Sequence, residues 1–216
     1  MALIYLIRHG ETVWNRDKRF QGQTDVDLTE KGTAQAELVA QRLSREKLDL
    51  VLASDLRRAS ETAKAVARLA GCPVELDPAL REMHFGVWQG YTREEIESRF
   101  DEAFTRYMGD ALDGRPTGGE TFHEVLTRVA DSLTRVVTRL PEGRIGVIAH
   151  GGTIRAALCH YLGWDPRRRG VYRLENCSIT LLEVRPTFVS LHYLNDRCHL
   201  DDAPAKPGQS QGGDAF

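Results

Sequence analysis

Short, continuous apolar runs alternate along the chain with longer segments whose apolar residues recur every three or four positions. The runs at 3–7, 50–53 and 145–149 are typical of strands that are buried on both faces of a sheet. The periodic segments at 29–46 and 55–70 are typical of amphipathic helices. This alternation predicts an α/β fold, a three-layer αβα sandwich with a mainly parallel central sheet.

Capping and turn signals delimit the remaining elements. Thr92 and Thr121 each stand three residues before a glutamate, the spacing of a capping box, and each precedes apolar residues at helical spacing. A further helix is expected from about 152 to 162. Residues 178–184 and 187–194 are rich in β-formers and predict a hairpin whose last strand is an antiparallel strand at the sheet edge.

One domain is expected over residues 1–200. Within it, residues 85–120 contain helical patterns and a glycine-rich loop, which indicates a small helical cap or insert. Residues 201–216 are rich in proline, glycine and polar residues. Such a composition predicts a disordered C-terminal tail.

Composition excludes several classes of protein. The 216 residues carry a net charge of −2, with a pI near 6.4, whereas nucleic-acid-binding proteins are usually basic. No apolar run approaches the roughly 18 residues of a membrane span, and the first residues lack the basic start of a signal peptide. Four cysteines without a CxxC pair indicate reduced thiols. We expect a cytoplasmic monomer or homodimer without nucleic-acid or membrane partners.

Two histidines stand in the same local context. His9 and His150 each follow an apolar strand and precede a glycine, in LIRHG and IAHGG. Ligands of open α/β sheets bind at the carboxyl ends of strands, at a topological switch point. A lone histidine there is usually structural, but two in matched contexts favour one site in which the imidazoles face each other.

Basic groups near these histidines suit a phosphate. Arg8 precedes His9, and Arg57 and Arg58 open the second predicted helix; guanidinium groups bind oxyanions, above all phosphate. The helix after His150 adds N–H groups and a positive dipole end. The sequence has no P-loop, no GxGxxG after the first strand, no GxSxG elbow and no HExxH or DxD metal motif. Phosphate chemistry would therefore run on protein cations and a nucleophile, without a metal.

Five sequence blocks, in order, resemble the signatures of the histidine phosphatase (phosphoglycerate-mutase-like) superfamily. The blocks are RHGET at 8–12 with Asn15 and Gln21-Gly22, SDLRRASETA at 54–63, Leu80-Arg81-Glu82 with Gly86, Trp88 and Gly90, GGET at 118–121, and AHG at 149–151. Their order and their spread over residues 3 to about 195 make a chance match very improbable.

The resemblance implies a role for each matching residue. His9 would be the nucleophile that becomes a phosphohistidine, and Glu82 would donate a proton to the leaving alkoxide. Arg8, Arg58 and His150 would hold the phosphate oxygens, with Arg58 preferred to Arg57 because it directly precedes Ala59. Asn15, Gln21 and Gly22 would complete the phosphate pocket, and Gly151 in the last block would be a further substrate-binding position. Met83 and His84, which directly follow Glu82, are expected to line the mouth of the site together with the 100–120 segment. No metal and no cofactor are implied, and the partner would be a small phosphorylated metabolite.

Departures from the mutase pattern favour a hydrolase. Mutases of this superfamily carry an Arg and a Tyr in the segment after the acid, where this chain has Met83, His84 and Phe85. The segment between Gly90 and Glu120 is also short, so water should reach a phosphohistidine. The sequence predicts a metal-independent phosphatase for small phosphomonoesters of the sugar phosphate, phosphoglycerate, phosphoserine or α-ribazole phosphate type. The alternatives are a cofactor-dependent phosphoglycerate mutase and a non-catalytic module that binds phosphorylated ligands.

Overall fold

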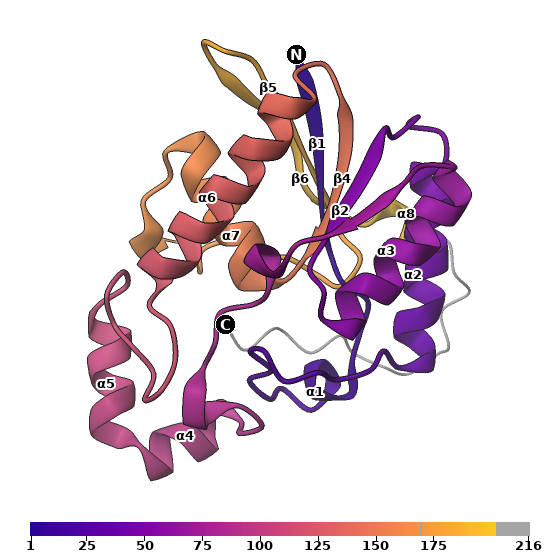
Figure 1. The fold of residues 1–216 in the computed structure, drawn as a ribbon. Helices are drawn as coiled ribbons and strands as arrows, with labels where there is room; N and C mark the ends of the chain where they lie inside the picture. Colours follow the sequence, from indigo (N-terminus) through magenta and orange to yellow (C-terminus); the bar gives the residue numbers. More distant parts are fainter. Residues whose placement is uncertain (169, 202–216) are drawn as a thin grey trace.

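A single mixed sheet organises the described part of the chain, residues 1–168 and 170–201, in the computed structural model. The strands are β1 (Ala2–Arg8), β2 (Leu50–Ala53), β3 (Val74–Leu76), β4 (Arg144–Ala149), β5 (Ile179–Val184) and β6 (Val189–Asp196). Their order across the sheet is β3-β2-β4-β1-β5-β6 (Figure 1). The first four strands in this order are parallel, whereas β5 runs antiparallel to β1 and β6 antiparallel to β5. The predicted α/β fold and the hairpin at the sheet edge are confirmed.

Helices cover both faces of this sheet. The α-helices are α1 (Val13–Arg16), α2 (Glu30–Leu43), α3 (Arg57–Ala70), α4 (Arg93–Arg99), α5 (Asp101–Gly109), α6 (Phe122–Arg139), α7 (Gly151–Leu162) and α8 (Cys198–Asp201), and single 3₁₀ turns lie at Pro78–Leu80, Gly86–Trp88 and Pro166–Arg168. Helices α2 and α3 lie on one face, α6 and α7 lie on the other, and α4 and α5 lie beyond the sheet at one end (Figure 1).

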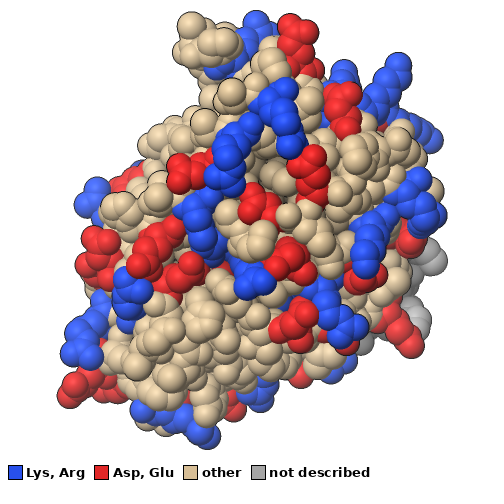
Figure 2. Space-filling view, viewed as in Figure 1, with Lys and Arg blue, Asp and Glu red and all other residues tan. Residues whose placement is uncertain are grey.

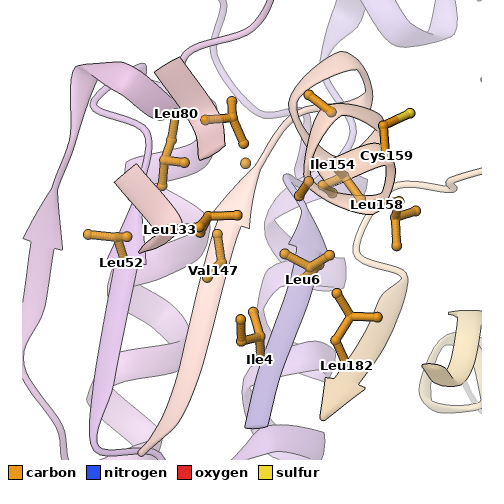
Figure 3. Close-up of a cluster of buried hydrophobic side chains, with 14 of the residues drawn as sticks. Ile4, Leu6, Leu52, Leu80, Leu133, Val147, Ile154, Leu158, Cys159 and Leu182 are labelled. Atoms are coloured by element: carbon orange, nitrogen blue, oxygen red, sulfur yellow. The ribbon is translucent and has the colours of Figure 1, made fainter. Parts of the chain in front are cut away.

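Alternate residues of the central strand enter opposite layers of the core. Leu6 of β1 packs with α6 and α7, and Figure 3 places it beside Ile154 and Leu158 of α7. Tyr5 and Ile7 of the same strand pack with α2 and α3 instead. The period of two along a strand therefore explains why the run at 3–7 is apolar throughout.

Two local predictions differ from the structure. Strand β3 was not predicted, because it has only three residues and lies half exposed at the sheet edge, where no apolar run is needed. The expected helical stripe after Thr92 is divided into α4 and α5, because Phe100 leaves the helical region with φ −134° and ψ 33°. Ile96 and Phe104 nevertheless bury their side chains in one cluster with Trp88.

The topology creates a switch point between β1 and β4. These strands are parallel neighbours, and Arg8 pairs with Ala149 at their carboxyl ends. The chain then leaves β1 toward α2 on one face and leaves β4 into α7 on the other face (Figure 1). The crevice that results is the usual ligand position in such sheets. His9 and His150 are the next residues on the two strands, so the sheet places them side by side.

Three other features bear on the sequence predictions. No helix among the described residues is long and apolar enough to cross a membrane. None of the four cysteines forms a disulfide. On the face drawn in Figure 2, basic and acidic side chains are interspersed, as the small net charge suggests. The predicted disordered tail lies outside the described residues from position 202 onward.

Gly32 allows α2 to pack against the segment that follows β1, and we expect Gly32→Ala to destabilise the protein. A Cβ at this position would lie 2.0 Å from the carbonyl oxygen of Glu11. The overpacking should cost about 1–3 kcal/mol of unfolding free energy, although alanine is the better helix former. In the matched variant Gly109→Ala the new Cβ meets nothing within 4 Å, so stability should rise by up to ~1 kcal/mol. Urea unfolding of both variants measures the difference; equal effects would contradict the close packing at Gly32.

Candidate active site

His9 and His150 form the centre of the site. Their ring centroids are 5.1 Å apart, with an interplanar angle of 57°, and both side chains are buried. The backbone N–H of His9 donates to the carbonyl of Ala149 at 3.0 Å, which extends the hydrogen bonding between β1 and β4 by one residue. The sequence predicted that the two imidazoles share one site, and the structure brings them together.

Hydrogen bonds define the tautomer of each ring. Nδ1 of His9 lies 2.7 Å from the carbonyl oxygen of Gly10; a carbonyl only accepts, so Nδ1 carries the proton and Nε2 keeps its lone pair. Nδ1 of His150 accepts from Nε of Arg58 at 3.2 Å, so the proton of His150 is on Nε2. That Nε2 is buried and has no hydrogen-bond partner among the described residues, so it is a donor available to a ligand oxygen.

Both imidazoles are held in the neutral form. Burial lowers the pKa of His9 well below its usual value of 6.5, and the positive charges of Arg58 and Arg8 lower it further. The pKa of His150 is lowered in the same way by burial, then by Arg58 and His9. At neutral pH the Nε2 atom of His9 is therefore an uncharged base, which is the form able to attack phosphorus.

The assigned tautomers can be measured. Long-range ¹H–¹⁵N correlation spectra of the imidazoles should show His9 as the Nδ1–H tautomer and His150 as the Nε2–H tautomer. Because both pKa values lie below 6.5, neither ring should titrate as the pH falls from 8 to about 6.5. His123, whose ring is exposed, is the internal control. A protonated His9 at pH 7, or the opposite tautomer, would contradict the hydrogen-bond assignment.

Arg58 supplies a fully buried cation beside the histidines. Besides His150, its guanidinium donates to the carbonyls of Gly22 at 2.7 Å and Thr24 at 2.8 Å. Burial lowers the pKa of Arg58 to about 10, so it remains charged at neutral pH. Arg57 is exposed and pairs with Asp27. The structure thus brings Arg58, and not Arg57, to the site.

Gly22 permits the turn that offers its carbonyl to Arg58. Its φ of +53° lies in the left-handed region, and a Cβ there would lie 2.1 Å from Oε1 of Gln89. The backbone conformation favours glycine, and a larger residue would also displace the side chain of Gln89. The same turn carries the predicted binding residue Gln21 into the wall of the cavity.

Asn15 and Gln21 direct amide groups to the same region. Oδ1 of Asn15 accepts from the backbone N–H of Thr12 and from the NH₂ group of Asn176. Oε1 of Gln21 accepts from the hydroxyl of Thr12 at 3.0 Å. With the carbonyl oxygens engaged, the NH₂ groups of Asn15 and Gln21 are the remaining donors. Both residues line the cavity, where NH₂ groups suit an oxyanion.

Glu82 lies at the N-terminus of α7. Its Oε2 accepts from the N–H of Gly152 at 3.1 Å, and its Oε1 accepts from the N–H of Met83 at 2.8 Å. A Cβ at position 152 would lie 2.3 Å from Glu82 Oε1, so glycine is required for this approach. Gly151 beside it lines the same cavity. The carboxyl group of Glu82 is thereby held at the N-terminus of α7, close to the N-cap residue His150.

A cavity of about 280 Å³ adjoins these groups. Arg8, His9, Arg58 and Glu82 line its polar part. Its apolar wall consists of Trp14, Phe20, Met83, Phe85, Tyr107, Met108, Ala111 and Phe122. The 100–120 segment thus contributes to the wall, as predicted. His150 contacts Arg58 and His9 but is not itself a lining residue.

His84, like His150, is a predicted site residue that does not line the cavity. Its N–H donates to Oε2 of Glu120 at 2.8 Å, and its Nδ1 accepts from the N–H of Gly86 at 3.1 Å. These bonds fix the turn after Glu82 and direct the ring away from the cavity. The prediction rested on adjacency to Met83, which does line the cavity, but consecutive residues of an extended segment point to opposite sides.

Several basic residues at the cavity were not predicted. Arg155 lines it, and its Nη1 lies 3.0 Å from the position of a Cβ on Gly151. The sequence contains a signal for this position, because Arg155 follows the predicted binding residue Gly151 by four residues and therefore lies on the same face of α7. Lys18 and Arg19 also line the cavity. Arg167 is 77% exposed and also borders the cavity.

Among the described residues, no group of three or more His, Cys, Asp or Glu side chains is placed to hold a metal ion. The positive charge at the cavity comes from the guanidinium groups of several arginines and from Lys18. Arg8 is the last residue of β1, Arg58 lies in the first turn of α3, and both line the cavity. A bound dianion would therefore be surrounded by protein donors and cations.

The site can be compared with known proteins. The model of the histidine phosphatase superfamily (branch 1) matches residues 4–197. A probable phosphoglycerate mutase (GpmB) of Serratia proteamaculans is 36% identical over 184 residues, covering 85% of each chain. Phosphoserine phosphatase 1 of Hydrogenobacter thermophilus is 33% identical, covering 94% of this chain and 96% of its own.

Solved structures give the same comparison. YhfR of Bacillus stearothermophilus superposes with a TM-score of 0.86 at 29% identity, covering 93% of this chain and all of its own. A mycobacterial glucosyl-3-phosphoglycerate phosphatase superposes with a TM-score of 0.83 at 31% identity, covering 90% of this chain and 99% of its own. Both solved structures share the fold of this chain.

Proposed function

Because the chain belongs to the histidine phosphatase superfamily (branch 1), we propose that it is a metal-independent phosphatase of small phosphomonoesters. The proposed reaction proceeds through a phosphohistidine on His9, with Glu82 as the proton donor. The observation that carries this proposal is the neutral His9, whose Nε2 lone pair is free while its Nδ1–H is bound to Gly10. A neutral imidazole beside two arginines combines a nucleophile with stabilisation of a dianion.

In the first step, the lone pair of His9 Nε2 forms an N–P bond while the P–O bond to the leaving group breaks. The leaving alkoxide takes a proton from the Glu82 carboxyl group, which becomes a carboxylate. Arg8 and Arg58 stabilise the charge on the phosphoryl oxygens, and the Nε2–H of His150 supplies a further donor. Phosphoryl transfer depends mainly on such positioning and charge neutralisation.

In the second step, water attacks the phosphorus atom and the N–P bond breaks, so the electron pair returns to His9 Nε2. The Glu82 carboxylate takes one proton from the water, and inorganic phosphate leaves. The enzyme then has its starting protonation states, with Glu82 protonated and His9 neutral. One carboxyl group thus serves as acid and base in turn.

The phosphomonoester class is supported by the names of similar proteins. Solved neighbours include phosphatases for glucosyl-3-phosphoglycerate, α-ribazole phosphate and phosphoserine. The similar proteins named phosphoglycerate mutase favour a second candidate, transfer of the phosphoryl group back to a second hydroxyl of the substrate. The segment after Glu82 offers Met83 and Phe85 to the cavity, whereas a mutase needs a group there to bind the carboxylate. We therefore favour hydrolysis.

Phosphate release from a panel of small phosphomonoesters in EDTA tests the proposal. The panel includes 3-phosphoglycerate, with isomerisation measured in the same reactions, and His9→Ala is the negative control. Release that depends on His9 and persists in EDTA is the expected result. Isomerisation without release, appearing only when a bisphosphoglycerate is added, would identify a mutase instead. Release lost in EDTA would contradict a metal-independent reaction.

A further inference from the structure

The segment that carries Glu82 has no regular secondary structure of its own. Residues 82–85 belong to neither a helix nor a strand and follow the 3₁₀ turn at Pro78–Leu80. A general acid must nevertheless be held within a fraction of an ångström of the leaving oxygen, since a 1 Å error can cost about 10²-fold in rate. The backbone of this segment therefore needs support from elsewhere in the fold.

Arg128 of α6 supplies that support. Its guanidinium donates to three main-chain carbonyls in the turn before the segment and at its first residue: Ala79 (2.7 Å), Arg81 (2.7 Å) and Glu82 (3.1 Å). The two remaining N–H groups donate to the carboxylate of Glu120, both at 3.0 Å. All five donors of the fork are used. The side chain is 20% exposed, so these bonds are sheltered from water.

Glu120 completes the arrangement from the loop before α6. Its Oε2 accepts from the N–H of His84 at 2.8 Å and from Nε2 of Gln23 at 3.3 Å. Gln23 also donates to the carbonyl of Glu82 at 3.2 Å. The Arg128–Glu120 pair therefore binds the chain on both sides of Glu82. Neither Arg128 nor Glu120 lines the cavity.

We propose that the Arg128–Glu120 pair is a positioning device for the proton donor: it fixes the peptide of Glu82 so that the carboxyl group meets the leaving oxygen. The carboxyl itself is held by Gly152 and Met83, and the pair holds the backbone from which it extends. The hydrogen bonds of the pair hold the Glu82 segment and do not involve His9 or Arg58, so we expect the pair to act on proton donation. The charge of Arg128 also adds to the lowering of the pKa of His150. This inference rests on the proposed role of Glu82.

The dependence of kcat/KM on the leaving group tests the proposal. Phenyl phosphate releases a basic phenolate that needs a proton, whereas p-nitrophenolate departs without one. We expect Arg128→Ala to lower kcat/KM for phenyl phosphate by roughly 10–100-fold and to leave that for p-nitrophenyl phosphate nearly unchanged. Arg135→Ala is the matched control, since Arg135 lies on the same helix, is 65% exposed and pairs with Asp77; it should change neither rate.

A double-mutant cycle separates positioning from a general structural effect. The Glu82→Gln variant has no carboxylic acid proton to donate. Adding Arg128→Ala to this variant should therefore cause no further loss of kcat/KM for phenyl phosphate. Arg128→Lys keeps the positive charge but loses the planar guanidinium group that makes the five hydrogen bonds. Its rates should therefore resemble those of Arg128→Ala. Glu120→Gln provides the same test if the Arg128 variants do not fold.

Three results would overturn the proposal. The first is an equal loss on both esters, which indicates general damage. The second is a loss that persists undiminished in the Glu82→Gln background. The third is full activity of Arg128→Lys, which would reduce the role of Arg128 to its charge. In all three cases the unmodified protein still hydrolyses the esters. If the unmodified protein does not hydrolyse them, the proposed function itself fails, so the two failures can be told apart.

Discussion

Replacement of His9 by alanine should reduce phosphate release by roughly 10⁴–10⁶-fold, as expected for loss of a covalent nucleophile. The Nε2 atom of His9 is the atom that forms the N–P bond in the proposed reaction, and no other neutral imidazole lines the described cavity. His150 cannot take over, because its Nδ1 is bound to Arg58 and its Nε2 carries the proton. Steady-state kinetics on p-nitrophenyl phosphate measures the effect.

His123→Ala is the matched control for this variant. The ring of His123 lies at the start of α6 and is 64% exposed, so its removal should leave kcat/KM unchanged. The His9 variant should still bind inorganic phosphate, because the guanidinium groups remain. More than about 1% residual turnover, far above the residual expected after loss of a nucleophile, would exclude His9 as the nucleophile.

Arg58→Lys should lower kcat/KM by roughly 10³–10⁵-fold, the range found when an arginine that stabilises phosphoryl transfer is removed. Lysine keeps a positive charge but loses the planar fork that holds Gly22, Thr24 and His150 together. The two carbonyls would lose a donor, and the tautomer of His150 would no longer be fixed. Kinetics with the folded fraction determined by circular dichroism measures the effect.

Arg57→Lys is the control for Arg58→Lys. The two residues are adjacent, but the side chain of Arg57 is 62% exposed and pairs with Asp27. An exposed pair of this kind contributes about 0–1 kcal/mol, so both stability and activity should be nearly unchanged. An Arg58→Lys variant that retains full activity would show that charge alone suffices and would contradict the role assigned to the fork.

The centre of the site could be predicted because the position of each histidine follows from the few residues around it. His9 and His150 each follow directly on a strand, and neighbouring parallel strands end at one edge of a sheet. The sequence context of the two histidines therefore implies that they lie close together. The preference for Arg58 over Arg57 came from the family resemblance, and the structure explains it by the burial of Arg58.

Other features depend on contacts between distant segments, which a single sequence does not disclose. Arg128 reaches back 46 residues to the carbonyl of Glu82, and its position on an amphipathic helix resembles that of an ordinary solvated arginine. His84 was misplaced because the backbone direction after Glu82 is set by Glu120. The predicted domain limits, cytoplasmic location and oligomeric state stay predictions.

Trapping the phosphoenzyme tests the central claim most directly. The protein is mixed with a ³²P-labelled phosphomonoester in EDTA, quenched in alkali within milliseconds, digested and sequenced by mass spectrometry. We predict label on the peptide that contains His9, stable in alkali and labile in acid as a phosphoramidate is, and approaching one equivalent when hydrolysis of the intermediate is slow. Turnover without label on His9, or label on another residue, would contradict the account.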